Sequence, residues 1–207
     1  MSAWVSTDRR AAGFTVVELL VVLTLLAVIG AIIAVSMSRG LQADAQARSR
    51  IEAFEDMQVA MERMTREIRG ASPVRAGEAV LEEADAETLQ FLVRRAGSEC
   101  LRFRYGVNDD GDTLLAAQQR SDDDCAEGTF GAWSEQLLVR DLEPGRPPFT
   151  FYRDDDREEA LDPGTMRLAD VAFVEITFQR TLVLDQRPVT VSTVVGLRNR
   201  DSVKELG

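Results

Sequence analysis

The chain contains no histidine among its 207 residues, and this absence restricts the chemistry it can perform. Histidine is the commonest general base and the commonest metal ligand of proteins, so a serine nucleophile here would need an unusual base. No glycine-rich phosphate loop follows an expected strand, and none of the many paired carboxylates is set apart by its context. We therefore expect no enzyme activity, no cofactor and no metal site.

Positive charge is also scarce, with 24 Lys and Arg against 35 Asp and Glu, which gives a net charge of -11. The first 35 residues are neutral in sum, because their only charged side chains are Asp8, Arg9, Arg10 and Glu18. All of the excess negative charge therefore lies from residue 36 onward. An acidic domain of this kind stays soluble and repels nucleic acids and anionic lipid surfaces. We expect no nucleic-acid partner for it.

Residues 14–35 form a nearly unbroken apolar run. As a helix this run would be roughly 33 Å long, enough to cross a hydrocarbon core of about 30 Å. Arg9 and Arg10 precede it, and basic residues on that side keep the N-terminus in the cytoplasm. The exception within the run is Glu18, since a carboxylate costs about 2.5–3.5 kcal/mol at the bilayer centre and less near the interface. We expect this carboxylate to have a partner.

The segment Arg9–Leu20, with the sequence RRAAGFTVVELL, resembles the leader junction of type IV pilins and type II secretion pseudopilins. The resemblance implies cleavage by a prepilin peptidase between Gly13 and Phe14, followed by N-methylation of Phe14. The family's assembly glutamate, the fifth mature residue, falls on Glu18. In a filament this carboxylate can pair with the α-amine of a neighbouring subunit or with that of its own helix, four residues away. Both arrangements remain open.

Two other interpretations compete for this N-terminus. The first is a signal peptide removed by signal peptidase, although the apolar run exceeds the usual 7–15 residues and no clean A-x-A site follows it. The second is a plain membrane anchor for an unrelated periplasmic domain. Under the pilin interpretation the protein is a single-pass protein of the bacterial inner membrane, with a cytoplasmic N-terminus and a periplasmic head.

The helix is expected to continue through residues 14–69, roughly 84 Å, and to end at the Gly-Ala-Ser-Pro sequence of residues 70–73. Its second half becomes amphipathic, with apolar residues at steps of three and four. They are Ile51, Phe54, Met57, Met61, Met64 and Ile68. We expect this stripe to pack against a sheet formed by the rest of the chain. A Met-rich stripe could instead serve a promiscuous partner.

The remainder of the chain is expected to form antiparallel strands, so the fold class is α+β with a pilin-like fold. Alternating or apolar-rich patterns indicate strands near residues 88–94, 101–105, 113–115, 136–142, 149–153, 171–184 and 189–197. The predicted division is a removed leader at 1–13, a membrane or filament-core helix at 14–35, an amphipathic helix at 36–70 and a β-rich head at 71–207.

Two features of the head have alternative interpretations. The loop Asn108–Asp112 is rich in oxygen ligands, so calcium is conceivable, but an Asp-Gly step between strands is by itself a hairpin signal. Cys100 and Cys125 are the only cysteines, and in an oxidising compartment they are expected to form one disulfide. Such a bond would contribute roughly 3 kcal/mol. Two free buried cysteines are the alternative.

Within the family, residues 60–71 are similar to the end of the long helix in larger minor pilins and in the J-type pseudopilin. Residues 193–199 are similar to the last strand of such minor pilins. These likenesses imply a minor subunit that helps to start or cap a filament beside other minor and major subunits, either in a pilus or in a type II secretion pseudopilus. An anchored periplasmic enzyme or binding protein is the alternative from a different class.

Overall fold

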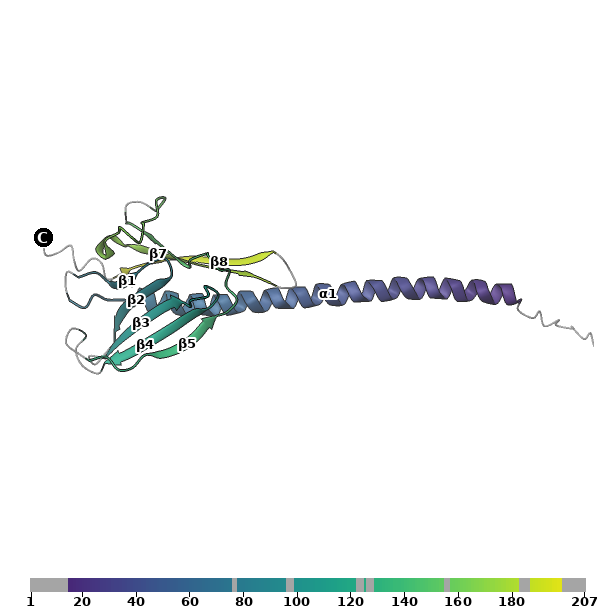
Figure 1. Ribbon diagram of the computed structural model, residues 1–207, viewed down its shortest axis with the longest axis horizontal. Helices are drawn as coiled ribbons and strands as arrows, with labels where there is room; N and C mark the ends of the chain where they lie inside the picture. Colours follow the sequence, from purple (N-terminus) through teal and green to yellow (C-terminus); the bar gives the residue numbers. More distant parts are fainter. Residues whose placement is uncertain are drawn as a thin grey trace, which may run out of the picture. The chain divides into compact units, whose positions relative to one another are not determined.

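The computed structural model describes residues 15–75, 78–95, 99–121, 125, 129–154, 157–182 and 187–198. The chain divides into two compact units, residues 1–47 and 48–207. The described residues form a long helix, a short 3-10 helix and eight strands, all drawn in Figure 1. In chain order they are α1 (Val16–Arg69), β1 (Leu81–Ala84), β2 (Thr88–Arg94), β3 (Cys100–Val107), β4 (Leu114–Ser121), β5 (Ser134–Val139), β6 (Phe149–Tyr152), η1 (Leu168–Asp170), β7 (Phe173–Thr181) and β8 (Pro188–Gly196).

The part of α1 that belongs to the first unit exposes apolar side chains on every side. Val16, Ile29 and Ile33 are 76%, 53% and 61% exposed, and none of this segment is buried within the chain. The hydroxyl of Thr24 donates to the carbonyl of Val21 at 2.8 Å, so it presents no unsatisfied donor. In the described part of the chain, α1 is the one helix long and apolar enough to span a membrane.

The second unit contains antiparallel β-structure, so the α+β expectation is confirmed, and the strands are divided between two sheets. One sheet has five strands in the order β1-β2-β3-β4-β5, and the other has three in the order β6-β7-β8 (Figure 1). In both sheets, strands that are neighbours in sequence are also neighbours in space. The chain crosses from the first sheet to the second after β5.

Most strands lie where the sequence pattern indicates, and β2 has the predicted bounds. The exception is β1, which the sequence analysis missed because two glutamates interrupt its apolar pattern. Glu82 receives two hydrogen bonds from the Arg102 guanidinium, at 2.8 and 2.9 Å, so its carboxylate is satisfied on the sheet surface. A sequence pattern alone does not reveal a partner twenty residues away.

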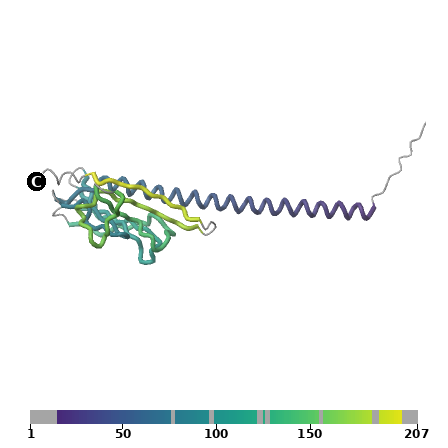
Figure 2. The backbone as a smooth tube through the Cα atoms, turned by 90° about the horizontal axis from the view of Figure 1, so that it is seen from above, coloured from purple at the N-terminus to yellow at the C-terminus, as the bar shows by residue number. Residues whose placement is uncertain are grey.

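The core lies between α1 and the two sheets, and Figure 2 shows the strands gathered beside this part of the helix. Met57, Met64 and Ile68 are fully buried, as the helical stripe predicts. They join an aromatic cluster in which the Phe91 and Phe103 ring centroids are 5.8 Å apart. The N-terminal end of the predicted stripe is wrong, because Ile51 and Phe54 are 56% and 41% exposed.

Candidate functional site

The first described residue, Thr15, caps the N-terminus of α1. Its hydroxyl oxygen accepts a hydrogen bond from the Glu18 N–H at 3.2 Å, and its carbonyl accepts one from the Leu19 N–H at 3.1 Å. An N-terminal turn leaves backbone donors without partners, and a threonine cap satisfies one of them. The predicted site residues Gly13 and Phe14 lie outside the described residues.

A local signal in the sequence marks this helix start and was missed in the sequence analysis. Thr15 and Glu18 have the Thr-x-x-Glu spacing of a capping box. The structure places Glu18 in the first turn of α1, where a carboxylate is favoured by the partial positive charge of the helix N-terminus. Glu18 therefore has a local structural reason for its position in addition to any role in assembly.

Glu18 is isolated from the other charges of its helix. The next ionisable residue along α1 is Arg39, which lies roughly 31 Å farther along the helix axis. No arginine of this helix can therefore neutralise Glu18 in a hydrocarbon environment. A positive group must come either from an α-amine a few residues upstream or from another molecule.

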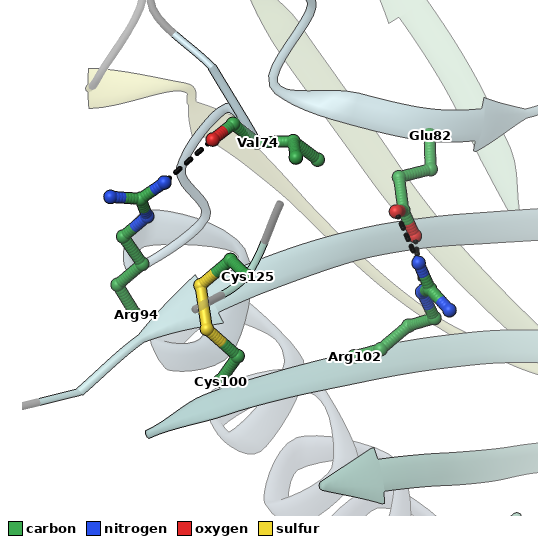
Figure 3. The surroundings of a disulfide bond; sticks show 6 residues. All are labelled: Val74, Glu82, Arg94, Cys100, Arg102 and Cys125. Carbon is green, nitrogen blue, oxygen red and sulfur yellow. Dashed lines mark hydrogen bonds and ion pairs between the residues drawn. A yellow bond between two sulfur atoms is a disulfide. The ribbon is translucent and has the colours of Figure 1, made fainter. Parts of the chain in front are cut away.

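A disulfide joins Cys100 and Cys125, whose Cα atoms are 5.5 Å apart (Figure 3). Cys100 is the first residue of β3, where it pairs with Ser121 at the last position of β4. The bond therefore fastens the chain just beyond the open end of the β3–β4 hairpin. Both cysteines are buried, and together with Leu92 they form a small apolar cluster.

Two arginine side chains near the disulfide link neighbouring segments of the chain (Figure 3). Arg94 donates to the carbonyl oxygen of Val74 at 2.6 Å, which ties the segment after α1 to β2. The guanidinium of Arg102 forms the ion pair with Glu82 between β3 and β1. These charge-assisted contacts help to hold the segments around the disulfide in place on the sheet.

The loop Asn108–Asp112 forms the turn between β3 and β4. The Asn108 side-chain oxygen accepts hydrogen bonds from the backbone N–H groups of Asp112 and Thr113, and its amide nitrogen donates to Asp112 Oδ1 at 2.9 Å. Gly111 takes a φ of 75°, a conformation in which glycine is favoured. Hydrogen bonds from Thr113 and Asn108 lower the pKa of the Asp112 carboxyl. These oxygen atoms are thus engaged in forming the turn.

Within the described ranges, no group of three His, Cys, Asp or Glu residues is arranged to hold a metal ion.

A buried polar contact joins α1 to the five-stranded sheet. The Tyr105 hydroxyl donates to the Glu67 carboxylate, and Arg63 pairs with the other oxygen of Glu67 at 3.1 Å. Arg63 also donates to Gln136 of β5 at 2.7 Å. These groups fix the rotation of α1 against β3 and β5.

Comparison with known families identifies the N-terminal segment. Residues 8–34 match the prokaryotic N-terminal methylation motif. A search of curated proteins found no match to the chain. The motif includes Gly13, Phe14 and Glu18, and it implies processing by a prepilin peptidase and assembly with other pilin subunits. The apolar helix that follows fits anchoring in the inner membrane. The chain therefore has a prepilin-type N-terminal motif that opens a long apolar helix, and an antiparallel β head follows in the α+β layout of pilin-like proteins.

Proposed function

We propose that this chain is a minor subunit of a type IV filament, cut after Gly13, methylated on Phe14 and assembled with other subunits in an initiation or tip complex. The observation that carries the proposal is the lone carboxylate of Glu18, set in the first turn of a helix whose next charge lies at Arg39. A carboxylate in that position makes insertion of a membrane anchor less favourable unless a positive group pairs with it.

Cleavage after Gly13 supplies such a group, because it creates an α-amine on Phe14. Separately, the amine and the Glu18 carboxylate would each be costly in a low-dielectric helix bundle, whereas together they form an ion pair. Among the described residues, the apolar side chains of α1 from Leu19 to Ser38 are exposed, and neighbouring helices can cover them inside a filament. Assembly thus covers the apolar surface and pairs the carboxylate at the same time.

The division of the mature chain follows the same logic, and we propose a membrane or filament-core helix at 14–35, an amphipathic helix at 36–70 and a head at 71–207. The minor role is supported by the likeness of residues 60–71 and 193–199 to minor pilins. A minor pseudopilin of a type II secretion system would share the processing and the carboxylate, so it is the second candidate within the same family.

The proposal predicts the chemical identity of the mature N-terminus. Mass spectrometry of the protein from a strain with an active prepilin peptidase should find N-methylated Phe14 as the first residue. The matched control is the variant Gly13→Ala, in which the leader should remain attached because the residue before the cut is altered. A native protein that still carries Met1 in the presence of the peptidase would contradict the proposal.

The variant Glu18→Ala should insert into the membrane normally but enter filaments at least roughly tenfold less, a change equivalent to about 1.4 kcal/mol. Comparison of sheared filaments with the membrane fraction by immunoblotting measures this ratio. Thr24→Ala is the matched control, because it removes a polar side chain from the same helix without removing a charge. Wild-type incorporation of Glu18→Ala would show that the carboxylate has no role in assembly.

Deletion of the gene then distinguishes the two candidate systems. Loss of surface pili with normal protein secretion supports the pilus assignment. Loss of secreted proteins with normal pili supports the pseudopilin.

A further inference from the structure

A hollow on the surface of the second unit runs along α1 beside the start of β8, and we call it the α1–β8 groove. Its volume is about 380 Å³, and its lining comes from two turns of α1 and from the second residue of β8. Figure 2 shows β8, in yellow, beside this part of α1. The lining residues are Arg50, Ile51, Phe54, Glu55, Gln58 and Val189.

Two large apolar side chains of the groove are incompletely covered. Ile51 and Phe54 are 56% and 41% exposed, whereas Met57 and Met64 of the same helix are fully buried. Val189, across the groove, packs against the core and is only partly buried. A single exposed apolar residue needs no explanation, but apolar side chains that share one groove indicate an interaction site.

The shape of the groove fits a helix as its occupant. Ile51, Phe54 and Gln58 recur at steps of three and four, so they lie on one side of α1. From residue 50 to residue 58 the groove follows α1 for roughly 12 Å. Two helices pack by placing a ridge of side chains from one into a groove of this kind on the other. The occupant would therefore lie along α1.

The charges of the groove fit an uncharged occupant. Its two charged residues, Arg50 and Glu55, have opposite signs, so the lining is neutral in sum although the net charge of the chain is -11. A charged segment in this groove would lose hydration without a net opposite charge to pair with it, and an apolar helix has no such cost. The chain itself contains a helix of this kind, since no ionisable residue lies between Glu18 and Arg39.

We propose that the α1–β8 groove receives the apolar N-terminal helix of a different subunit of the filament, with Ile51 and Phe54 as the main contacts. The inference rests on the proposed function, because assembly is the step that brings such a helix beside the head. The occupant is a different subunit because two heads that each carry the charge of this chain repel one another. Subunit contacts then extend beyond the apolar part of α1 to the head.

Lysine substitutions in the full-length protein test the proposal. Ile51→Lys and Phe54→Lys should each insert into the membrane normally but enter filaments at least roughly tenfold less than the wild type, because the contact would bury an unpaired charge. Immunoblotting of sheared filaments against the membrane fraction measures this ratio. The matched control is Val59→Lys, which should assemble as the wild type does. Val59 is 69% exposed on the same helix and does not line the groove.

The outcomes separate this inference from the proposed function. Absence of the wild type from filaments would overturn both. Normal incorporation of folded Ile51→Lys and Phe54→Lys, beside impaired Glu18→Ala, would overturn this inference alone, as would an equal loss in Val59→Lys. Near-ultraviolet circular dichroism in micelles checks that each variant folds. If Phe54→Lys does not fold, Ile51→Lys decides the test, because its side chain is the more exposed of the two.

Photo-crosslinking in assembled filaments identifies the occupant. A benzophenone amino acid in place of Phe54 keeps an aromatic side chain in the groove, and the same amino acid in place of Val59 is the control. Mass spectrometry of the Phe54 adduct should find a peptide from the apolar N-terminal helix of another subunit, which the Val59 adduct should lack. An adduct with the head of a subunit, or with a second copy of this chain, would overturn the proposal.

Discussion

Tyr105 is the buried side chain through which β3 and α1 share a hydrogen bond. Its ring is fully inaccessible, and its hydroxyl meets the Glu67 carboxylate. Burial is the main cause that raises the pKa of the Tyr105 phenol, and the negative charge of Glu67 raises it further. An ordinary tyrosine ionises near pH 10, so the folded protein keeps this proton at a pH where the unfolded chain loses it.

Stability should therefore decrease as pH rises above about 10, and Tyr105→Phe should remove much of this dependence. A raised folded-state pKa gives stability that is complete below the unfolded pKa and is lost above it, by at most about 1.4 kcal/mol per pH unit for one group. At pH 7 the variant should be less stable by about 1 kcal/mol, because a hydrogen bond is lost.

Urea denaturation of the full chain in micelles between pH 7 and 11 measures both effects. Tyr152→Phe is the matched control, since its hydroxyl donates to Glu175 at 2.7 Å near the surface and hydrogen bonding is the main cause that raises its pKa. The control should retain most of the alkaline loss. An identical pH dependence in the wild type and in Tyr105→Phe would contradict the account of Tyr105.

The elements of this protein differ in how well the sequence predicts them. The C-terminal part of α1 and β2 follow from apolar periodicity, since local pattern and tertiary burial agree there. Ile51 and Phe54 satisfy the same helical pattern yet remain largely exposed, because the pattern does not tell how far along the helix the sheets extend. β1 escapes detection because the partner that neutralises Glu82 lies on another strand.

The same contrast applies to the candidate site. Gly13, Phe14 and Glu18 are identified by the resemblance of their segment to a prepilin leader junction, and the family motif covers them. The positive group that we propose as the partner of Glu18 cannot be derived from the sequence, because it would be created by cleavage or would belong to another molecule. Likewise the edge position of β8 among the described strands becomes visible only when the order of the strands is known.

The Cys100–Cys125 disulfide is the covalent link within the β3–β4 region, and its sequence separation is 25. Replacing both cysteines with serine should destabilise the head by about 3 kcal/mol, because the unfolded chain regains the freedom of the open loop. For a domain of this size the loss corresponds to a decrease in melting temperature of about 6–12 °C.

Circular dichroism melting of the double variant and of the reduced wild type measures this loss. The two should melt at the same temperature, since they lack the same bond. A melting temperature equal to that of the oxidised wild type would show that the disulfide adds no stability.

At the scale of the whole molecule, the two units differ in how much of their apolar surface they bury. Residues 16–47 expose apolar side chains and bury none, whereas the second unit has its own core of helix and sheets. A fragment of residues 48–207 should therefore fold without detergent, while the full chain should require micelles or lipid.

Near-ultraviolet circular dichroism and analytical ultracentrifugation of the fragment check this expectation. The fragment should give the aromatic signals of the head in the full chain and sediment as a soluble species, with the full chain in micelles as the reference. A fragment without fixed aromatic signals would show that the head depends on its anchor.

The position of the disulfide also determines how the head responds to a mechanical load. If a force pulls on α1 and on the C-terminal strands, the residues enclosed between Cys100 and Cys125 cannot lengthen, because the sulfur bridge bypasses them. Their full extension would add about 85 Å to the length of an unravelled chain. The oxidised head thus limits how far one subunit can stretch under tension.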